Sequence, residues 1–201
     1  MGTRGRPRSF DRAEALRRAM LLFWERGYQS TSIADLATAM GIHAPSLYAA
    51  FGSKEQLFAE AVDLYDQLEG EATRRALEQP AAREAVEALL SYNADSYTDP
   101  TTPTGCMVVL GCVASSPDAH GAAALLAARR SADRATLRRR LDQAVADGGL
   151  PAETDTDALA VFFIAVLQGL AIQARDGATR QELQPVIDHA MRVWDTVTAP
   201  T

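Results

Sequence analysis

Few side chains in this sequence are suited to covalent or metal chemistry. The 201 residues include two cysteines, Cys106 and Cys112, three histidines and a single lysine, Lys54. Two residues six apart on a helix face different sides, so the spacing of the cysteines does not favour a shared metal or redox site. We find no glycine-rich phosphate loop, nucleophile elbow or paired-histidine motif. We therefore expect no enzyme activity, no cofactor and no metal site.

The arginines near the N-terminus suit a different chemistry, the binding of a polyanion. Residues 1–60 carry eight basic and six acidic side chains, whereas residues 61–201 carry twelve basic and twenty acidic ones. A basic end on an acidic body indicates that one end meets nucleic acid. The segment Arg4-Gly5-Arg6-Pro7-Arg8 resembles the core of an AT-hook, which implies that Arg6 and Arg8 enter a narrow minor groove. A tail that adds only non-specific attraction is the alternative.

The elements that must position these residues are helices. The chain has 38 alanines, the strongest helix formers, and no sustained alternation of polar and apolar residues typical of strands. Glycine, proline and capping residues divide it into about nine helices, and the fold class is all-α. The expected ranges are Arg12–Arg26, Ser32–Met40, Ala44–Phe51, Lys54–Glu78, Ala82–Tyr97, Gly105–Ser115, Asp118–Asp147, Thr156–Arg175 and Thr179–Val197.

The charge balance changes at residue 60, where we divide the chain, and the composition shifts after Pro80. Residues 1–60 are expected to form an N-terminal arm and a DNA-binding domain, and residues 61–201 a helical body. The longest apolar stretches, Ala158–Leu167 and Gly105–Ala114, are shorter than the roughly 20 residues that span a bilayer. The N-terminus lacks the apolar region of a secretory signal. We expect a soluble protein in the cytoplasm.

The second and third helices carry the strongest functional signal. They are short and amphipathic, and they meet at a glycine turn at Gly41. This pattern is typical of a helix-turn-helix, whose second helix enters the major groove of DNA. Leu47 and Phe51 face the inside of the third helix, and small residues on its outside allow close approach to the bases. An ordinary helical hairpin is the alternative from this pattern alone.

A longer run of residues resembles the N-terminal domain of the TetR family of bacterial transcriptional regulators. The resemblance rests on Gly27-Tyr28-Gln29-Ser30-Thr31-Ser32-Ile33-Ala34-Asp35-Leu36-Ala37, Met40-Gly41-Ile42, Leu47-Tyr48, Phe51, Ser53-Lys54-Glu55 and Leu57. It covers about residues 10–60. It implies a three-helix DNA-binding domain followed by a C-terminal ligand-binding and dimerisation domain.

The resemblance also assigns roles to single residues. It implies that Thr31 caps the second helix and contacts a DNA phosphate beside Ser32, and that Tyr48 and Lys54 contact the DNA backbone. Base reading then falls to residues at the start and on the outside of the third helix. These are His43, Ala44, Pro45, Ser46 and Ala49. Position 50 is Ala, where many relatives have His or Tyr, so an operator sequence is not transferred from a relative.

The C-terminal helices are expected to hold a second copy of the chain. Ala158–Leu167 is apolar all round, so it is expected to be buried on most sides. By resemblance, the last two long helices form a four-helix interface in a homodimer, which would place two recognition helices on an inverted-repeat operator of double-stranded DNA. The candidate interface residues are Leu159, Phe162, Phe163, Val166, Leu170, Val193 and Trp194.

By resemblance, the middle helices enclose a cavity for a small-molecule effector. Polar groups on otherwise apolar helices could orient such a ligand, and a mostly apolar cavity suits a hydrophobic effector. The candidates are Tyr92, Asn93, Tyr97, Cys106, Met107, Leu110 and Gln168. Plain core packing is the alternative for each of them.

We interpret the sequence as a ligand-responsive transcriptional regulator, most simply a repressor that an effector releases from DNA. A helical carrier or scavenger of apolar molecules is one alternative. A redox sensor based on Cys106 is another, provided that Cys106 lies at a helix N-terminus, where the pKa of a thiol falls.

Overall fold

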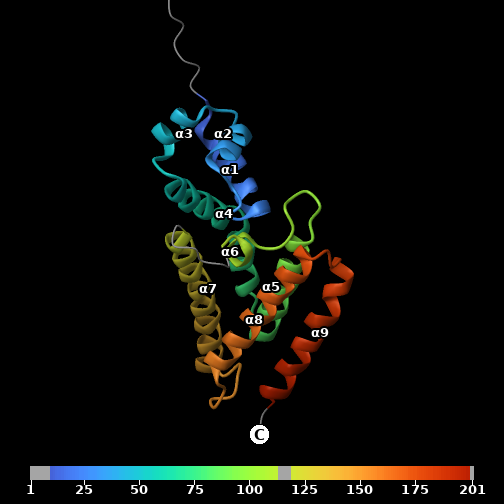
Figure 1. Cartoon of the computed structure of the whole chain (residues 1–201). Coiled ribbons are helices and arrows are strands. Elements are labelled where there is room, and N and C mark those ends of the chain that lie inside the picture. The colour runs from blue at the N-terminus through green and yellow to red at the C-terminus, as the bar shows by residue number, and fades with distance from the viewer. Residues whose placement is uncertain (1–9, 113–118, 200–201) are drawn as a thin grey trace, which may run out of the picture.

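The computed structural model describes residues 10–112 and 119–199 of the chain. These residues form nine α-helices and no strand (Figure 1), so the prediction of an all-α fold is confirmed. The helices are α1 (Arg12–Arg26), α2 (Ile33–Met40), α3 (Ala44–Phe51), α4 (Lys54–Leu77), α5 (Ala82–Tyr97), α6 (Met107–Leu110), α7 (His120–Ala146), α8 (Thr156–Arg175) and α9 (Arg180–Val197).

Helices α1 to α3 and the start of α4 form a small head at one end of the molecule (Figure 1). The side chain of Asp11 accepts hydrogen bonds from two amides of the first turn of α1, and Gly27 ends the helix with a φ of 78°. Phe23 packs edge-on against Phe58 of α4, with ring centroids 4.9 Å apart, and Tyr28 packs on Phe58 at 5.0 Å. This aromatic cluster fixes α1 against α4.

Ser32 is the N-cap of α2, and the prediction that Thr31 fills this position is wrong. The hydroxyl of Ser32 accepts a hydrogen bond from the amide of Asp35 at 3.1 Å, and the carboxylate of Asp35 accepts one from the amide of Ser32 at 2.9 Å. This reciprocal pair is a capping box. The hydroxyl of Thr31 instead donates to the carbonyl of Gly27 at 2.7 Å, which turns the side chain inward. Two adjacent hydroxyl residues made the register ambiguous in the sequence.

The long helix α4 joins the head to the body. Ser53 caps its start by accepting a hydrogen bond from the amide of Gln56 at 3.0 Å. The helix begins beside α3 and continues into the body, where it packs against α5 and α7 (Figure 1). One rigid element therefore contacts both the head and the body.

The body is a bundle of α5, α7, α8 and α9 with α6 between it and the head (Figure 1). Phe163 of α8 is fully buried, and its ring lies 5.7 Å from that of Trp194 of α9. The predicted helix Gly105–Ser115 is much shorter, because Gly105 has a φ of 75° and α6 ends at Leu110. The last three residues of that prediction, 113–115, lie outside the described residues, as does the predicted start of α7 at Asp118.

Helix α8 is apolar on all sides but is not buried on all sides. By length and composition it could cross a membrane, yet only 39% of its most apolar window is buried within the protomer. A core helix of a soluble protein has the same length and composition, so α8 by itself does not indicate a membrane span. Val161 and Ile172 remain exposed on one face of the helix. An exposed apolar face of this kind is typical of a surface that contacts another molecule.

Candidate DNA interface and ligand cavity

Helix α3 presents one side to solvent at the tip of the head. Leu47 and Phe51 are buried beneath it, whereas Tyr48 is 49% exposed. The other predicted base-reading positions are accessible. His43, Pro45 and Ala49 are exposed, and Ala44 and Ser46 are half-buried. The helix therefore offers an aromatic hydroxyl and several small side chains on a convex surface that fits a groove.

Lys54 lies at the start of α4, next to this surface. Its ammonium group sits 4.2 Å from the centre of the Tyr28 ring, and partial burial lowers the pKa of Lys54. The cation–π contact holds the stem of the side chain in place. Ser32, at the start of α2, is also exposed, so hydroxyl, ammonium and amide groups gather on the same end of the molecule.

Thr31, a sequence candidate for a phosphate contact, does not join this surface. Thr31 is fully buried and donates inward, so it is not presented to a DNA phosphate. Arg6 and Arg8 lie outside the described residues. The neighbouring Arg12 forms an ion pair with Glu60 of α4 at 2.8 Å, and its guanidinium lies 4.3 Å from the centre of the Phe51 ring. Arg12 therefore fastens α1 to α3 and α4.

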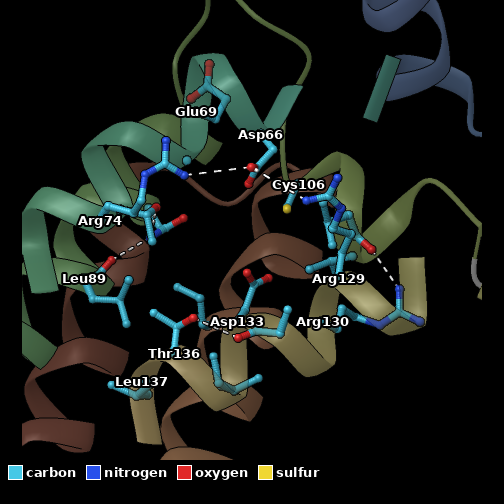
Figure 2. Close-up of a pocket in the computed structure, with 18 of the residues that line it drawn as sticks. Asp66, Glu69, Arg74, Leu89, Cys106, Arg129, Arg130, Asp133, Thr136 and Leu137 are labelled. Atoms are coloured by element: carbon cyan, nitrogen blue, oxygen red, sulfur yellow. Dashed lines mark hydrogen bonds and ion pairs between the residues drawn. The ribbon is translucent and has the colours of Figure 1, made fainter. Parts of the chain in front are cut away.

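A cavity of about 390 Å³ lies in the body, among α4, α5, α7 and α8 (Figure 2). Of the predicted ligand residues, Tyr92, Asn93, Tyr97, Cys106 and Gln168 line it. Met107 and Leu110 do not, because the turn at Gly105 rotates α6 so that Met107 is fully buried in the core. The volume is sufficient for a small organic molecule.

The cavity wall is amphipathic, with more charge than the sequence reasoning expected. Apolar side chains such as Leu89, Leu137 and Ile164 alternate with ionised ones. The charged lining residues are Asp66, Glu69, Arg74, Arg129, Arg130, Asp133 and Arg139. This lining suits a ligand that has a polar group as well as an apolar body, and the hydrophobic effector stays a prediction.

The missed residue Asp133 carried a sequence signal. On α7 it follows Leu126 by seven residues and precedes Leu137 by four, so this exposed residue lies on the side of the arginine-rich helix that lines the cavity. Burial among protein atoms, and then the nearby charge of Asp66, raise the pKa of Asp133 to about 6, although Arg129 and Arg130 oppose the shift.

Cys106 is buried at the inner end of the cavity. The hydroxyl of Tyr65 donates a hydrogen bond to its sulfur at 3.4 Å. Cys106 precedes α6, but burial outweighs the hydrogen bonds and raises the pKa of the thiol. A raised pKa does not favour a redox sensor based on Cys106. Within the described residues, no group of three or more His, Cys, Asp or Glu side chains is placed to hold a metal ion.

The head and the body meet at a joint formed by α1, α8 and the segment around α6. The indole Nε1 of Trp24 donates to the carbonyl of Gly105 at 3.0 Å, and the Trp24 ring packs edge-on against Tyr65, a cavity residue, at 4.8 Å. Arg175 of α8 donates to the carbonyls of Trp24, Glu25 and residue 104 at 2.8, 2.7 and 2.9 Å. The cavity wall and α1 are thus in direct contact.

The predicted dimer-interface residues divide into two groups. Leu159, Phe163, Leu170 and Trp194 are at most 7% exposed and form the core of the protomer, so their prediction as interface residues is wrong. Phe162 and Val166 are half-buried, and Val193 is 39% exposed. The apolar face of α8 and α9 also includes Val161, Ile172, Val186 and Val197, which the sequence reasoning missed. Uniform hydrophobicity along α8 concealed which side faces outward.

Two family profiles match the chain. That of the bacterial regulatory proteins of the tetR family matches residues 15–61, and that of the tetracyclin repressor-like C-terminal domain matches residues 82–192. Together they cover the head and most of the body.

Relatives align with the chain over nearly its whole length. The HTH-type transcriptional repressor ComR of Escherichia coli (strain K12) is 37% identical over 194 residues, which cover 96% of this chain and 92% of ComR. The HTH-type transcriptional repressor BdcR of the same strain is 32% identical over 183 residues, covering 89% and 86% of the two chains.

Solved structures agree with this assignment. A cysteine mutant of the TetR family transcriptional regulator CifR, complexed with 26-bp double-strand operator DNA, is 44% identical and superposes with a TM-score of 0.91, covering 94% of this chain and 100% of that one. A TetR transcriptional regulator from Chloroflexus aurantiacus J-10-FL is 26% identical, with a TM-score of 0.79 and coverage of 92% and 93%. The fold, the head and the body all lead to one conclusion: this chain belongs to the TetR family of bacterial transcriptional regulators.

Proposed function

We propose that this protein is a transcriptional repressor that binds an inverted-repeat operator as a homodimer and leaves it when a small molecule occupies the body cavity. The observation that carries the proposal is the contact between that cavity and α1: Tyr65 lines the cavity and packs against Trp24. The likeness to ComR, BdcR and the DNA-bound CifR supports it. Such a protein works in the cytoplasm, and the proposal requires no catalytic step.

The DNA-binding part of the proposal assigns two kinds of contact. Tyr48, Lys54 and Ser32 meet phosphates, because they are accessible and carry hydroxyl or ammonium groups. His43, Ala44, Pro45, Ser46 and Ala49 approach the base edges. Ser46 can donate to or accept from a base, and Ala44 can contact a thymine methyl group. Arg6 and Arg8 remain candidates for a minor-groove arm.

The dimer forms through the exposed apolar face of α8 and α9. Val161 and Ile172 on α8, and Val186 and Val193 on α9, lie uncovered in the protomer. A side-chain carbon added at Gly169 would meet no atom within 4 Å, so this part of α8 is open to a neighbour. Packing against the same face of a second copy would bury these residues and pair two α3 helices on one DNA face.

The contact between the head and the body around Trp24 and Arg175 gives a route by which a bound ligand releases the protein from DNA. A ligand that favours one arrangement of Tyr65 and Cys106 favours one position of Trp24, and through α1 one orientation of α3. The ligand shifts the equilibrium only by its difference in affinity for the two arrangements. This route adds α1 to α4 as a connection between the cavity and the DNA-binding surface.

Sequencing of genomic fragments retained by the purified protein at near-physiological salt tests the proposal. We expect one enriched inverted repeat, whose two halves lie about one helical turn apart or a multiple of it. A Tyr48→Phe variant removes one hydroxyl from the surface of α3 and should retain the same repeat with lower yield. Retention of bulk DNA without any enriched repeat would contradict site-specific regulation and favour the carrier alternative.

A further inference from the structure

Asp133 occupies the centre of the cavity wall on α7. Figure 2 shows its carboxylate pointing toward the space below Asp66 of α4, away from the helix that bears it. The side chain keeps accessible surface, and this surface faces the cavity. Asp133 thus presents an acceptor group to anything that enters.

The other carboxylates of the wall already have partners. Asp66 forms ion pairs with Arg74 and Arg129, both at 3.8 Å, and Glu69 accepts a hydrogen bond from the hydroxyl of Ser96 at 2.9 Å. In the described part of the chain, the carboxylate of Asp133 forms neither an ion pair nor a hydrogen bond with another residue, and none of the dashed lines in Figure 2 reaches it.

The arginines of the wall are directed elsewhere. Arg129 pairs with Asp63 as well as with Asp66 on the surface of α4. Arg130 donates to the carbonyl of residue 108 at 2.8 Å, at the edge of the view in Figure 2. Arg139 donates to the hydroxyl of Thr136 at 2.9 Å. Arg130 and Arg139 thus donate to neutral oxygens, and Asp133 is the carboxylate of this wall that has neither an ion pair nor a hydrogen bond among the described residues.

We propose that the effector is an amphipathic organic amine, whose protonated nitrogen is held by Asp133 and whose apolar body lies against Leu89, Leu137 and Ile164. This inference rests on the proposed effector function and specifies its ligand class. An ammonium group supplies the charged hydrogen-bond donors that the carboxylate of Asp133 lacks, next to the second carboxylate of Asp66. The 390 Å³ of the cavity limits the ligand to a small molecule.

The protonation of Asp133 gives this site a pH dependence. The groups around it are Asp66 and Arg74 on α4, Tyr97 on α5, Arg129 and Arg130 on α7 and the neutral Gln168 on α8. With a pKa of about 6, Asp133 is mostly ionised at pH 7.5 and mostly protonated at pH 5. An amine binds the ionised form, so its affinity rises with pH across this interval.

Three probes with the same apolar body test the proposal by calorimetry on the full chain without DNA: 4-phenylbutylamine, 4-phenylbutanol and 4-phenylbutyrate. At pH 7.5 we expect the amine to bind about tenfold more tightly than the alcohol, and the carboxylate to bind most weakly. Asp133→Asn should remove the preference for the amine and leave the alcohol unaffected. Glu69→Gln, which alters a carboxylate that is already hydrogen-bonded, should retain it. At pH 5 the preference should fall by up to about tenfold in the wild-type chain.

If 4-phenylbutyrate binds most tightly of the three probes, the proposal is overturned, because the arginines of the wall then hold the ligand. A preference for the amine that survives Asp133→Asn, or failure of all three probes to bind, would overturn it as well. Operator release is measured separately, by fluorescence anisotropy of labelled operator DNA. If the amine binds through Asp133 but leaves the operator bound, the ligand class stands and the proposed release mechanism fails.

Discussion

Replacing Arg175 with alanine isolates the contribution of the joint between head and body. The guanidinium donates three hydrogen bonds, to the carbonyls of Trp24 and Glu25 at the end of α1 and to that of residue 104. A net contribution of about 1 kcal/mol for each bond gives about 3 kcal/mol. Because Arg175 is partly exposed, water replaces some of these bonds in the variant. We expect the free energy of unfolding to fall by about 2–3 kcal/mol.

Chemical denaturation of purified Arg175→Ala measures this loss. For a chain of this length, it corresponds to a fall in Tm of about 4–12 °C. Arg83→Ala is the matched control, because Arg83 donates to Asp195 at 2.7 and 3.2 Å but lies on the exposed surface of the body. Its removal should cost less than about 1 kcal/mol. Equal losses in the two variants would refute the reasoning, since the joint would then contribute no more than a surface ion pair.

Four further predictions concern the DNA surface, the dimer and the cavity. Lys54→Ala should weaken binding to all DNA sequences alike and reduce the slope of log affinity against log salt by about one; a loss confined to one operator would argue against a phosphate contact. Ser46→Ala should instead relax the preference at one base position by about 1–3 kcal/mol, seen by selection from randomised operators, whereas uniform weakening would exclude a base contact. Val161→Asp combined with Val193→Asp should convert the dimer to a monomer in sedimentation velocity, and an unchanged dimer would place the interface elsewhere. Because the pKa of Asp133 is raised from 3.8 to about 6 in the folded chain, its stabilising contribution is complete below about pH 4 and is lost as pH rises through 6. Asp133→Asn should therefore raise Tm at pH 7.5 and have little effect at pH 4. A larger change in Tm at pH 4 than at pH 7.5 would contradict the raised pKa of Asp133.

Local signals in the sequence were sufficient for the helices and for the exposed side of α3. Caps and glycine turns are decided by nearby residues, so α1, α3, α5 and α8 begin and end where the pattern predicts them. Where two neighbours compete for one position, the pattern fails. Thr31 and Ser32 can both cap a helix, and only the tertiary fold, which buries Thr31, selects Ser32.

The parts of the site that depend on packing between helices were less predictable. Phe163 and Val161 have the same character in the sequence, but one lies in the protomer core and the other on its surface, because only neighbouring helices decide which side of α8 is covered. Asp133 was overlooked because a carboxylate among arginines on α7 is usually a solvated surface residue. Its alignment with Leu137 on the inner face was the available signal.

The single lysine of the chain has a practical consequence for labelling. Amine-reactive reagents have one side-chain target, Lys54, besides the α-amino group. Its partial burial over Tyr28 lowers the pKa of the ammonium group, so a larger fraction is the nucleophilic free amine at mildly alkaline pH. A fluorophore or an isotopic acyl group can thus be attached at one defined point on the face that we assign to DNA. The rate of this acylation, with and without nucleic acid, reports occupancy of that face directly.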